Sequence, residues 1–281
     1  MKLLANIAVL GRDRTGVVAA VTQFLFQNGA NIEEIEQQVI RGRFSMSLQA
    51  SWPAGRLDRH EIVEGLKRVG SSLHMEVRTH FLDPKRRARL ALFVTREPEC
   101  PEAVVRAVKS RRIPAEIALV VANHQTLHGI ASRTDAPFVL LDYTDRAAAE
   151  KKALEALERH EVDWIVLARF MKILSPDFVW RYRNKIINIH PSLLPSFPGA
   201  SAYRQAYEHG VKIMGVSAHL VTPNLDEGPI ICQEAFKLRP GEPLPSIVAR
   251  GRLLEAQVLV RAIRLCLRRR LDIHWGVVHN V

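Results

Sequence analysis

Cysteine is scarce in this chain: three of its 281 residues, Cys100, Cys232 and Cys266, are cysteines. Their scattered positions provide neither a disulfide framework nor the paired spacing of a zinc site. We therefore expect reduced thiols, a cytoplasmic location and no bound metal. Long apolar runs are missing as well: the sequence has no stretch of about 18 uncharged apolar residues, so we predict no membrane-spanning helix.

Acidic residues are in the minority, because 29 Asp and Glu stand against 40 Lys and Arg and give a formal net charge of +11. Such a charge raises nucleic-acid binding as a hypothesis. The basic clusters at 85–87, 109–112 and 268–270 are not interleaved with aromatic residues, as a groove for a single strand would be. We therefore expect a basic surface without a nucleic-acid partner. The same field would attract a polyanionic small ligand.

The first part of the chain follows the order strand, helix, strand, strand, helix, strand. Strands are predicted at 3–10, 30–40, 44–52 and 74–82, and helices at 17–29 and 59–73. The turn Arg41-Gly42-Arg43 joins the two middle strands as a hairpin. This order predicts a ferredoxin-like βαββαβ domain over residues 1–84.

Beyond a basic linker at 83–89 the pattern changes, and short apolar runs alternate with amphipathic segments. The apolar runs lie at 90–95, 116–123, 138–142, 164–170 and 185–190, and a long helix is predicted at 250–270. Continuous apolar strands that alternate with helices are typical of a doubly wound, mostly parallel α/β sheet. We predict that residues 85–281 form this second domain.

The stretch "INIHPSLLPSFPGASAYRQAY", residues 187–207, contains the candidate site of the second domain. Asn188 and His190 lie two positions apart, so an extended strand would place both side chains on one face. A stiff loop rich in proline follows at the carboxyl end of this strand, where open α/β sheets bind ligands. Asp226 follows another predicted strand and a loop.

These three side chains suit chemistry at a carbonyl carbon. The amide of Asn188 can donate to a developing oxyanion, and the imidazole of His190 can move a proton. The carboxylate of Asp226 can orient that imidazole and favour its charged form. Ser192 and Ser196 lie nearby, but neither is in the Gly-x-Ser-x-Gly pattern of a serine hydrolase.

The segment "GRDRTGVVAAVTQFLFQNGANI", residues 11–32, resembles the ACT domain signature. ACT domains commonly pair through their sheets and bind small ligands, often amino acids. The resemblance thus implies a homo-oligomer with an amino-acid effector, and a purely structural or oligomerising role is the alternative. The ligand-binding candidates that it implies are Gly11, Asp13, Arg14, Gly16, Asn31 and Ile32.

The segments "NIHPSLLPSFPGA" and "LARFMKILSPDFV", together with Asp226, resemble the formyltetrahydrofolate-dependent formyltransferase superfamily. The resemblance implies that Asn188 polarises the formyl oxygen, that His190 is the general acid and base, and that Asp226 holds His190 and a water. It also implies a folate pocket formed by residues 170–174 and 221, with His219 in support. The pocket residues are Phe170, Met171, Lys172, Ile173, Leu174 and Val221. The implied substrate is 10-formyltetrahydrofolate, with no further cofactor.

Members of this superfamily differ in the acceptor of the formyl group. An ACT unit in front of this fold is typical of the deformylases, which use water and supply formate for one-carbon and purine metabolism. The stretch Leu92–Ala103 has no glycine, unlike the phosphate-binding loop of the glycinamide ribonucleotide transformylases. Pro191, Ser201 and Ser217 depart from the residues that are frequent in deformylases. Transfer to an amine and a non-catalytic folate or amino-acid sensor therefore remain alternatives.

Overall fold

The computed structural model describes residues 2–53, 57–83, 86–268, 271–274 and 276–279. The chain divides into two compact units. The first unit comprises residues up to Arg86 together with Ser175–Arg183, and the second comprises Arg87–Leu174 and the residues from Asn184 onward. The boundary predicted between residues 84 and 85 lies outside the described residues.

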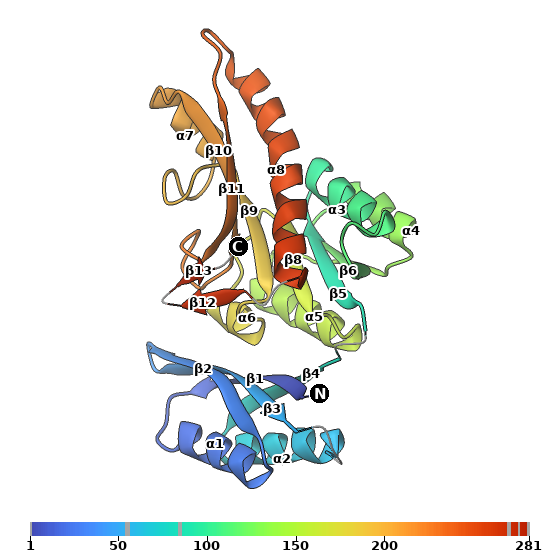
Figure 1. The fold of residues 1–281 in the computed structure, drawn as a ribbon, viewed down its shortest axis with the longest axis vertical. Coiled ribbons are helices and arrows are strands. Elements are labelled where there is room, and N and C mark those ends of the chain that lie inside the picture. The colour runs from blue at the N-terminus through green and yellow to red at the C-terminus, as the bar shows by residue number, and fades with distance from the viewer. Residues whose placement is uncertain (1, 54–56, 84–85, 269–270, 275, 280–281) are drawn as a thin grey trace. The chain divides into compact units, whose positions relative to one another are not determined.

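The first unit is a four-stranded antiparallel sheet with two helices on one face (Figure 1). Its spatial order is β2-β3-β1-β4. The strands are β1 (Leu3–Arg12), β2 (Asn31–Ile40), β3 (Arg43–Trp52) and β4 (Met75–Leu82), and the helices are α1 (Val17–Gln27) and α2 (Arg59–Ser72). The predicted βαββαβ order is confirmed.

Local signals explain where the helices of this unit begin and end. The chain enters α1 through Gly16 at φ 87° and leaves it through Gly29 at φ 71°, conformations that favour glycine. The side chain of Asp58 caps α2 by accepting hydrogen bonds from two backbone amides of its first turn. Gly11 lies so close to Met75 that a Cβ atom at this position would be 2.2 Å from the sulfur.

A short helix from later in the chain also belongs to the first unit. It is α6 (Pro176–Arg181), whose first turn is capped by the side chain of Ser175. Its Trp180 is buried with Ala8 and Leu10 of β1. The side chain of Arg183 makes an ion pair with Glu36 at 2.6 Å. Residues 175–183 therefore pack with the first unit, although they lie within the range predicted for the second domain.

The second unit contains a seven-stranded sheet in the order β11-β10-β9-β8-β5-β6-β7. The strands β5 to β9 are parallel, whereas β10 runs antiparallel to both of its neighbours. The order of connection reverses between β5 and β8, which makes this the switch point of the sheet. The strands are β5 (Ala88–Val94), β6 (Ala115–Ala122), β7 (Phe138–Leu140), β8 (Trp164–Ala168), β9 (Ile186–His190), β10 (Ile213–Leu220) and β11 (Ile230–Lys237).

The sheet is covered by helices, and α8 runs along β9, β10 and β11 (Figure 1). This helix shares an apolar core with α3, α4 and one face of the sheet. The helices are α3 (Glu99–Lys109), α4 (His128–Thr134), α5 (Arg146–Arg159), α7 (Ala202–Glu208) and α8 (Leu244–Arg268), with a 3-10 turn η1 (Gln125–Leu127) before α4. The predicted doubly wound, mostly parallel sheet is confirmed. None of the described helices is long and apolar enough to cross a membrane.

Three elements of this unit differ from the prediction. The strand β11 and the helix α7 were not predicted, because β11 is an edge strand with mixed polarity and α7 has only seven residues. The helix α8 begins six residues before the predicted start at residue 250, and the predicted residues 269–270 lie outside the described part of the chain. A pair of short strands, β12 (Asp272–His274) and β13 (Val277–His279), follows.

Candidate active site

The strand β9 presents its two polar side chains on one face of the sheet, as predicted. Ile187 and Ile189 belong to the core under α8, so Asn188 and His190 point to the opposite face. The neighbouring strand β10 runs antiparallel and places His219 opposite Asn188 and Ser217 opposite His190. The backbone pairing of β9 and β10 thus brings His190, His219 and Asn188 onto one face of the sheet.

Asn188 and His219 make a direct side-chain contact across these two strands. The Nδ2 atom of Asn188 lies 3.1 Å from Nε2 of His219. His219 donates its Nδ1–H to the carbonyl of Leu220 at 3.0 Å, so its Nε2 can accept from the amide. One amide N–H of Asn188 is then used, and the other can still donate to a ligand.

Asp226 reaches the same place from the loop after β10. Its backbone is left-handed, with φ 55°, a conformation that Asp tolerates better than most residues. The loop passes so close to β10 that a Cβ atom at Gly228 would be 1.7 Å from the carbonyl oxygen of Leu220. Only glycine fits there, and the close approach directs the Asp226 side chain toward the two histidines.

The carboxylate of Asp226 lies between three partners. Its Oδ2 atom accepts a hydrogen bond from the backbone amide of Gly199 at 2.8 Å and lies 3.3 Å from Nδ1 of His190. Its Oδ1 atom lies 3.6 Å from Nε2 of His219. The side chains of His190, His219 and Asp226 are only 5%, 3% and 6% exposed. The charges in this site are therefore weakly screened by solvent.

The two ring nitrogens of His190 have different environments. Nε2 donates to the backbone carbonyl of Phe197 at 2.9 Å, because a carbonyl oxygen can only accept. This hydrogen bond leaves Nδ1 facing Asp226. In the neutral ring Nδ1 carries the lone pair, and it is therefore the nitrogen that can take a proton.

The environment moves the pKa values of both groups downward. Burial lowers the pKa of His190, and the Phe197 carbonyl and the Asp226 charge offset this only in part. Burial by itself would raise the pKa of Asp226, but the neighbouring His219, the hydrogen bond that the Gly199 amide donates and the neighbouring His190 outweigh it and lower the pKa. At neutral pH the site therefore holds a neutral imidazole beside a carboxylate.

The predicted folate segment separates into buried and exposed residues. Phe170 and Leu174 are buried, and the ring of Phe170 packs edge-on against Phe93 with ring centres 5.2 Å apart. Met171 and Ile173 instead expose 57% and 61% of their surface. An apolar pair that is exposed at the end of β8 is suited to bind an apolar ring.

Tyr143 follows β7 in the chain and packs against this segment. Its ring packs against Phe170 at 5.7 Å, and the ammonium of Lys172 lies 5.4 Å from the same ring. Asp142, the residue before Tyr143, lines a cavity of about 540 Å³ that was not predicted from the sequence. Its lining includes Asn123, His124, Gln125, Leu140, Asp142 and Lys152. The other predicted pocket residue, Val221, is half-buried and donates its amide to the Ile186 carbonyl.

A buried ion pair at the end of β8 was also not predicted. Arg169 has a left-handed backbone, with φ 63°, and its Nη1 lies 3.3 Å from Oε2 of Glu255 on α8. Glu255 is fully buried and accepts a hydrogen bond from the Tyr203 hydroxyl at 2.8 Å. Burial raises the pKa of Glu255 even though Arg169 opposes this shift. The sequence feature that could have indicated this ion pair is Glu255, an acidic residue within the apolar face of the long helix.

The ACT-domain candidates lie in two groups. Gly11 pairs with Phe44 at one end of β1, next to the turn that contains Asp13, Arg14 and Gly16. Asn31 pairs with Ser51, which pairs with Leu4 at the other end of β1, and Ile32 follows it in β2. One chain therefore does not bring the six candidates together.

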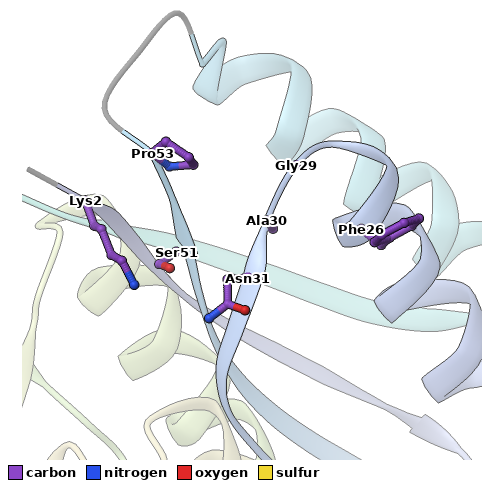
Figure 2. Close-up of a pocket in the computed structure, with 7 residues that line it drawn as sticks. All are labelled: Lys2, Phe26, Gly29, Ala30, Asn31, Ser51 and Pro53. Carbon is purple, nitrogen blue, oxygen red and sulfur yellow. The ribbon is translucent and has the colours of Figure 1, made fainter.

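A cavity of about 640 Å³ lies at the Asn31 end of this sheet. Figure 2 shows Lys2, Ser51 and Asn31 on one side of the cavity and Phe26 on the other. Lys2 makes an ion pair with Glu33 at 2.9 Å, and Glu33 also accepts a hydrogen bond from Ser51. Among the described residues of both units, no group of three or more His, Cys, Asp or Glu side chains is placed to hold a metal ion.

Comparisons with known proteins find two families in this chain. The formyl transferase family matches residues 88–263, and the ACT domain family matches residues 4–80. The formyltetrahydrofolate deformylase of Bacillus subtilis (strain 168) is 38% identical over 267 residues, which cover 93% of this chain and 88% of the relative.

Two groups of solved structures are similar to this chain. A formyltetrahydrofolate deformylase from Pseudomonas syringae pv. tomato has a TM-score of 0.67 and 30% identity over 98% of this chain and 93% of its own. A glycinamide ribonucleotide transformylase 1 from Geobacillus kaustophilus has a TM-score of 0.62 and 36% identity, but it covers 65% of this chain and 100% of its own. The deformylase structure thus matches nearly the whole chain, whereas the transformylase structure matches about two thirds of it.

Proposed function

Because this chain belongs to the formyltetrahydrofolate deformylases, which are hydrolases, we propose that it cleaves 10-formyltetrahydrofolate into formate and tetrahydrofolate. The formate would then be available for one-carbon and purine metabolism. The observation that carries the proposed mechanism is the 3.3 Å approach of Asp226 to Nδ1 of His190, with Asn188 on the same face.

In the first step water attacks the formyl carbon. A new bond forms between the water oxygen and that carbon, and the proton leaves the water for Nδ1 of His190. The formyl oxygen becomes an oxyanion, which accepts the free amide N–H of Asn188. Asp226 stabilises the imidazolium, because its carboxylate faces the nitrogen that has just become charged.

In the second step the tetrahedral intermediate collapses. The bond between the carbon and N10 breaks, and the imidazolium of His190 returns its proton to the leaving nitrogen. Formic acid and tetrahydrofolate are released, and the acid loses its proton to water. His219 supports this cycle from β10, because its contacts with Asn188 and Asp226 hold both side chains in place.

The folate is proposed to bind at the exposed end of β8. Met171 and Ile173 offer apolar surface to the pterin ring, and the backbone groups of residues 170–174 can bind its polar edge. The loop from Val221 to Asp226 forms the other side. The cavity lined by Asp142 and Lys152 is proposed to take the carboxylate tail of the folate, because the ammonium of Lys152 suits that charge.

Ion pairs at the switch point of the sheet favour water over a phosphate-bearing amine as the acceptor. Arg169 makes an ion pair with Glu255 at the end of β8. Just after β5, Arg252 makes ion pairs with Glu97 at 2.9 Å and Glu99 at 3.6 Å. These charged side chains belong to the chain itself and stand where open α/β sheets commonly bind a ligand. A phosphate-bearing acceptor would meet paired carboxylates there rather than a glycine-rich loop.

An assay with the substrate alone tests this proposal. The protein is incubated with 10-formyltetrahydrofolate, and formate and tetrahydrofolate are followed with and without added amines. Equal release in both conditions supports hydrolysis. Release that requires an amine would instead indicate a transferase, and tight binding without turnover would indicate a folate sensor.

The first unit is proposed to be regulatory. The ACT family match supports binding of a small effector such as an amino acid, and pairing of two copies through their sheets. Titration with each of the common amino acids while formate release is followed tests the effector. Sedimentation velocity tests whether the chain is an oligomer.

A further inference from the structure

The loop that follows His190 returns to the same histidine. Residues 191–201 connect β9 to α7, and within them Phe197 places its carbonyl 2.9 Å from Nε2 of His190. Phe197 has a left-handed backbone, with φ 54°, which is uncommon for an aromatic residue. Something must therefore hold this carbonyl in position, because the loop has no regular secondary structure of its own.

Ser217 holds the start of this loop. It lies on β10 opposite His190 and is fully buried. Its hydroxyl donates to the carbonyl of Ser192 at 2.6 Å and accepts from the amide of Leu194 at 2.9 Å. It also accepts from Nε2 of Gln233 at 2.7 Å. A serine hydroxyl has one donor and two acceptor sites, so all three are used and the direction of each bond is fixed.

Gln233, on the next strand, makes hydrogen bonds to Ser217 and to the same loop. It lies on β11 opposite Ser217, and its Nε2 also donates to the carbonyl of Leu194 at 3.0 Å. The two side chains thus bind both backbone groups of Leu194 and the carbonyl of Ser192. We call Ser217 and Gln233 the loop clamp.

Hydrogen bonds within the loop connect the clamped residues to Phe197. The hydroxyl of Ser192 donates to the carbonyl of Ser196 at 2.5 Å, and the amide of Ser196 donates to the carbonyl of Leu193 at 2.9 Å. Leu193 is seated closely on β10, where a Cβ atom at Gly215 would be 2.3 Å from its Cγ. The turn that ends at Phe197 therefore has little freedom.

We propose that the loop clamp is a positioning device for the hydrolysis: Ser217 and Gln233 fix the Phe197 carbonyl, and this carbonyl selects the tautomer of His190 that keeps Nδ1 free to act as the base. This inference rests on the proposed function. Without the carbonyl, a proton on Nδ1 could donate to Asp226 instead. That tautomer would have its basic nitrogen at Nε2, on the side of the ring away from Asp226.

The pH dependence of the reaction follows from the groups around His190. Asp226 in the loop after β10, His219 on β10 and Arg169 at the end of β8 act on it electrostatically, and the Phe197 carbonyl raises its pKa through the hydrogen bond. Loss of that bond removes a group that favours the protonated ring. The acid limb of the kcat/KM profile should then move to lower pH.

The test uses Ser217→Ala, Gln233→Met and the conservative Ser217→Thr in the full chain. We expect Ser217→Ala and Gln233→Met to lower kcat about 10- to 100-fold, as loss of an orienting residue does, with little change in KM. Ser217→Thr keeps the hydroxyl and should restore most of the activity and the position of the acid limb. Cys232→Ala is the control, because Cys232 neighbours Gln233 but packs toward α8.

Nitrogen-15 spectra of the histidine rings give a readout that does not depend on turnover. The His190 signals are assigned with His190→Gln, and the protonated and bare ring nitrogens are distinguished by their shifts. We expect a proton on Nε2 in the natural chain and loss of that preference in Ser217→Ala. An unchanged tautomer and an unchanged acid limb in Ser217→Ala, or failure of Ser217→Thr to restore activity, would overturn the proposal. If the natural chain releases no formate, the proposed function fails, while the tautomer result still decides the clamp.

Discussion

Replacement of Asp226 by Asn removes one charge from the site and little else. Asparagine is nearly the same size and tolerates the left-handed backbone of this position, so the fold should be kept. The lost interaction is that between the carboxylate and the imidazolium, whose atoms lie 3.3 Å apart. Two unit charges at this distance interact by about 5 kcal/mol at an effective dielectric constant of about 20, which sets an upper value.

Part of that energy is recovered by other groups, and we expect kcat to fall on the order of 10³-fold. KM should change little, because the charge acts mainly after the proton has moved to His190. The acid limb of kcat/KM should also shift to lower pH, since Asp226 raises the pKa of His190. Steady-state formate release between pH 5 and 9 measures both effects.

Asp135→Asn is a matched control for this prediction. Asp135 is another aspartate of the second unit with φ 55°, and it ends α4. The control should keep full activity, and both variants should keep the far-ultraviolet dichroism of the natural chain. An Asp226→Asn enzyme with kcat close to that of the natural chain would refute the assigned role of the carboxylate.

Three further changes test other parts of the site. Asn188→Asp replaces the amide donor by an acceptor, and we expect kcat/KM to fall about 10²- to 10³-fold in the same formate assay. Arg169→Met leaves Glu255 buried without its partner and should cost about 3 kcal/mol or more in a urea unfolding curve, whereas the double variant Arg169→Met, Glu255→Met should recover most of this. We expect the natural chain to pass no formyl to hydroxylamine and the double variant to pass some. Gly228→Ala should lower both stability and kcat, because the added Cβ would meet the Leu220 carbonyl at 1.7 Å, and a wild-type rate would contradict the assigned close approach.

Much of the fold could be predicted because local pattern and tertiary packing agree. The helix α1 ends where Asn28-Gly29 predicts, and the hairpin at Arg41–Arg43 joins β2 to β3. The strand β11 could not be predicted in this way. It is an edge strand whose outer residues are polar, so only its pairing with β10 makes it a strand.

The site, too, has residues that a local sequence pattern predicts and residues that only tertiary packing brings together. Asn188 and His190 could be found from their spacing on an apolar strand, and their common face is confirmed by the pairing with β10. The contacts of Asp226 depend on a left-handed residue and a close approach at Gly228, which no local pattern encodes. The ion pair of Arg169 and Glu255 joins residues far apart in the chain, and it becomes visible only when α8 is packed on the sheet.

The central claim is that water attacks the formyl carbon directly, and the origin of the oxygen in formate tests it. A single turnover of 10-formyltetrahydrofolate in water enriched in oxygen-18, without any amine, is analysed by mass spectrometry of the formate. We predict one solvent oxygen in each formate released, and no release above background by the Asp226→Asn chain on the same timescale. Formate that carries no solvent oxygen, or no formate at all until an amine is added, would contradict the account.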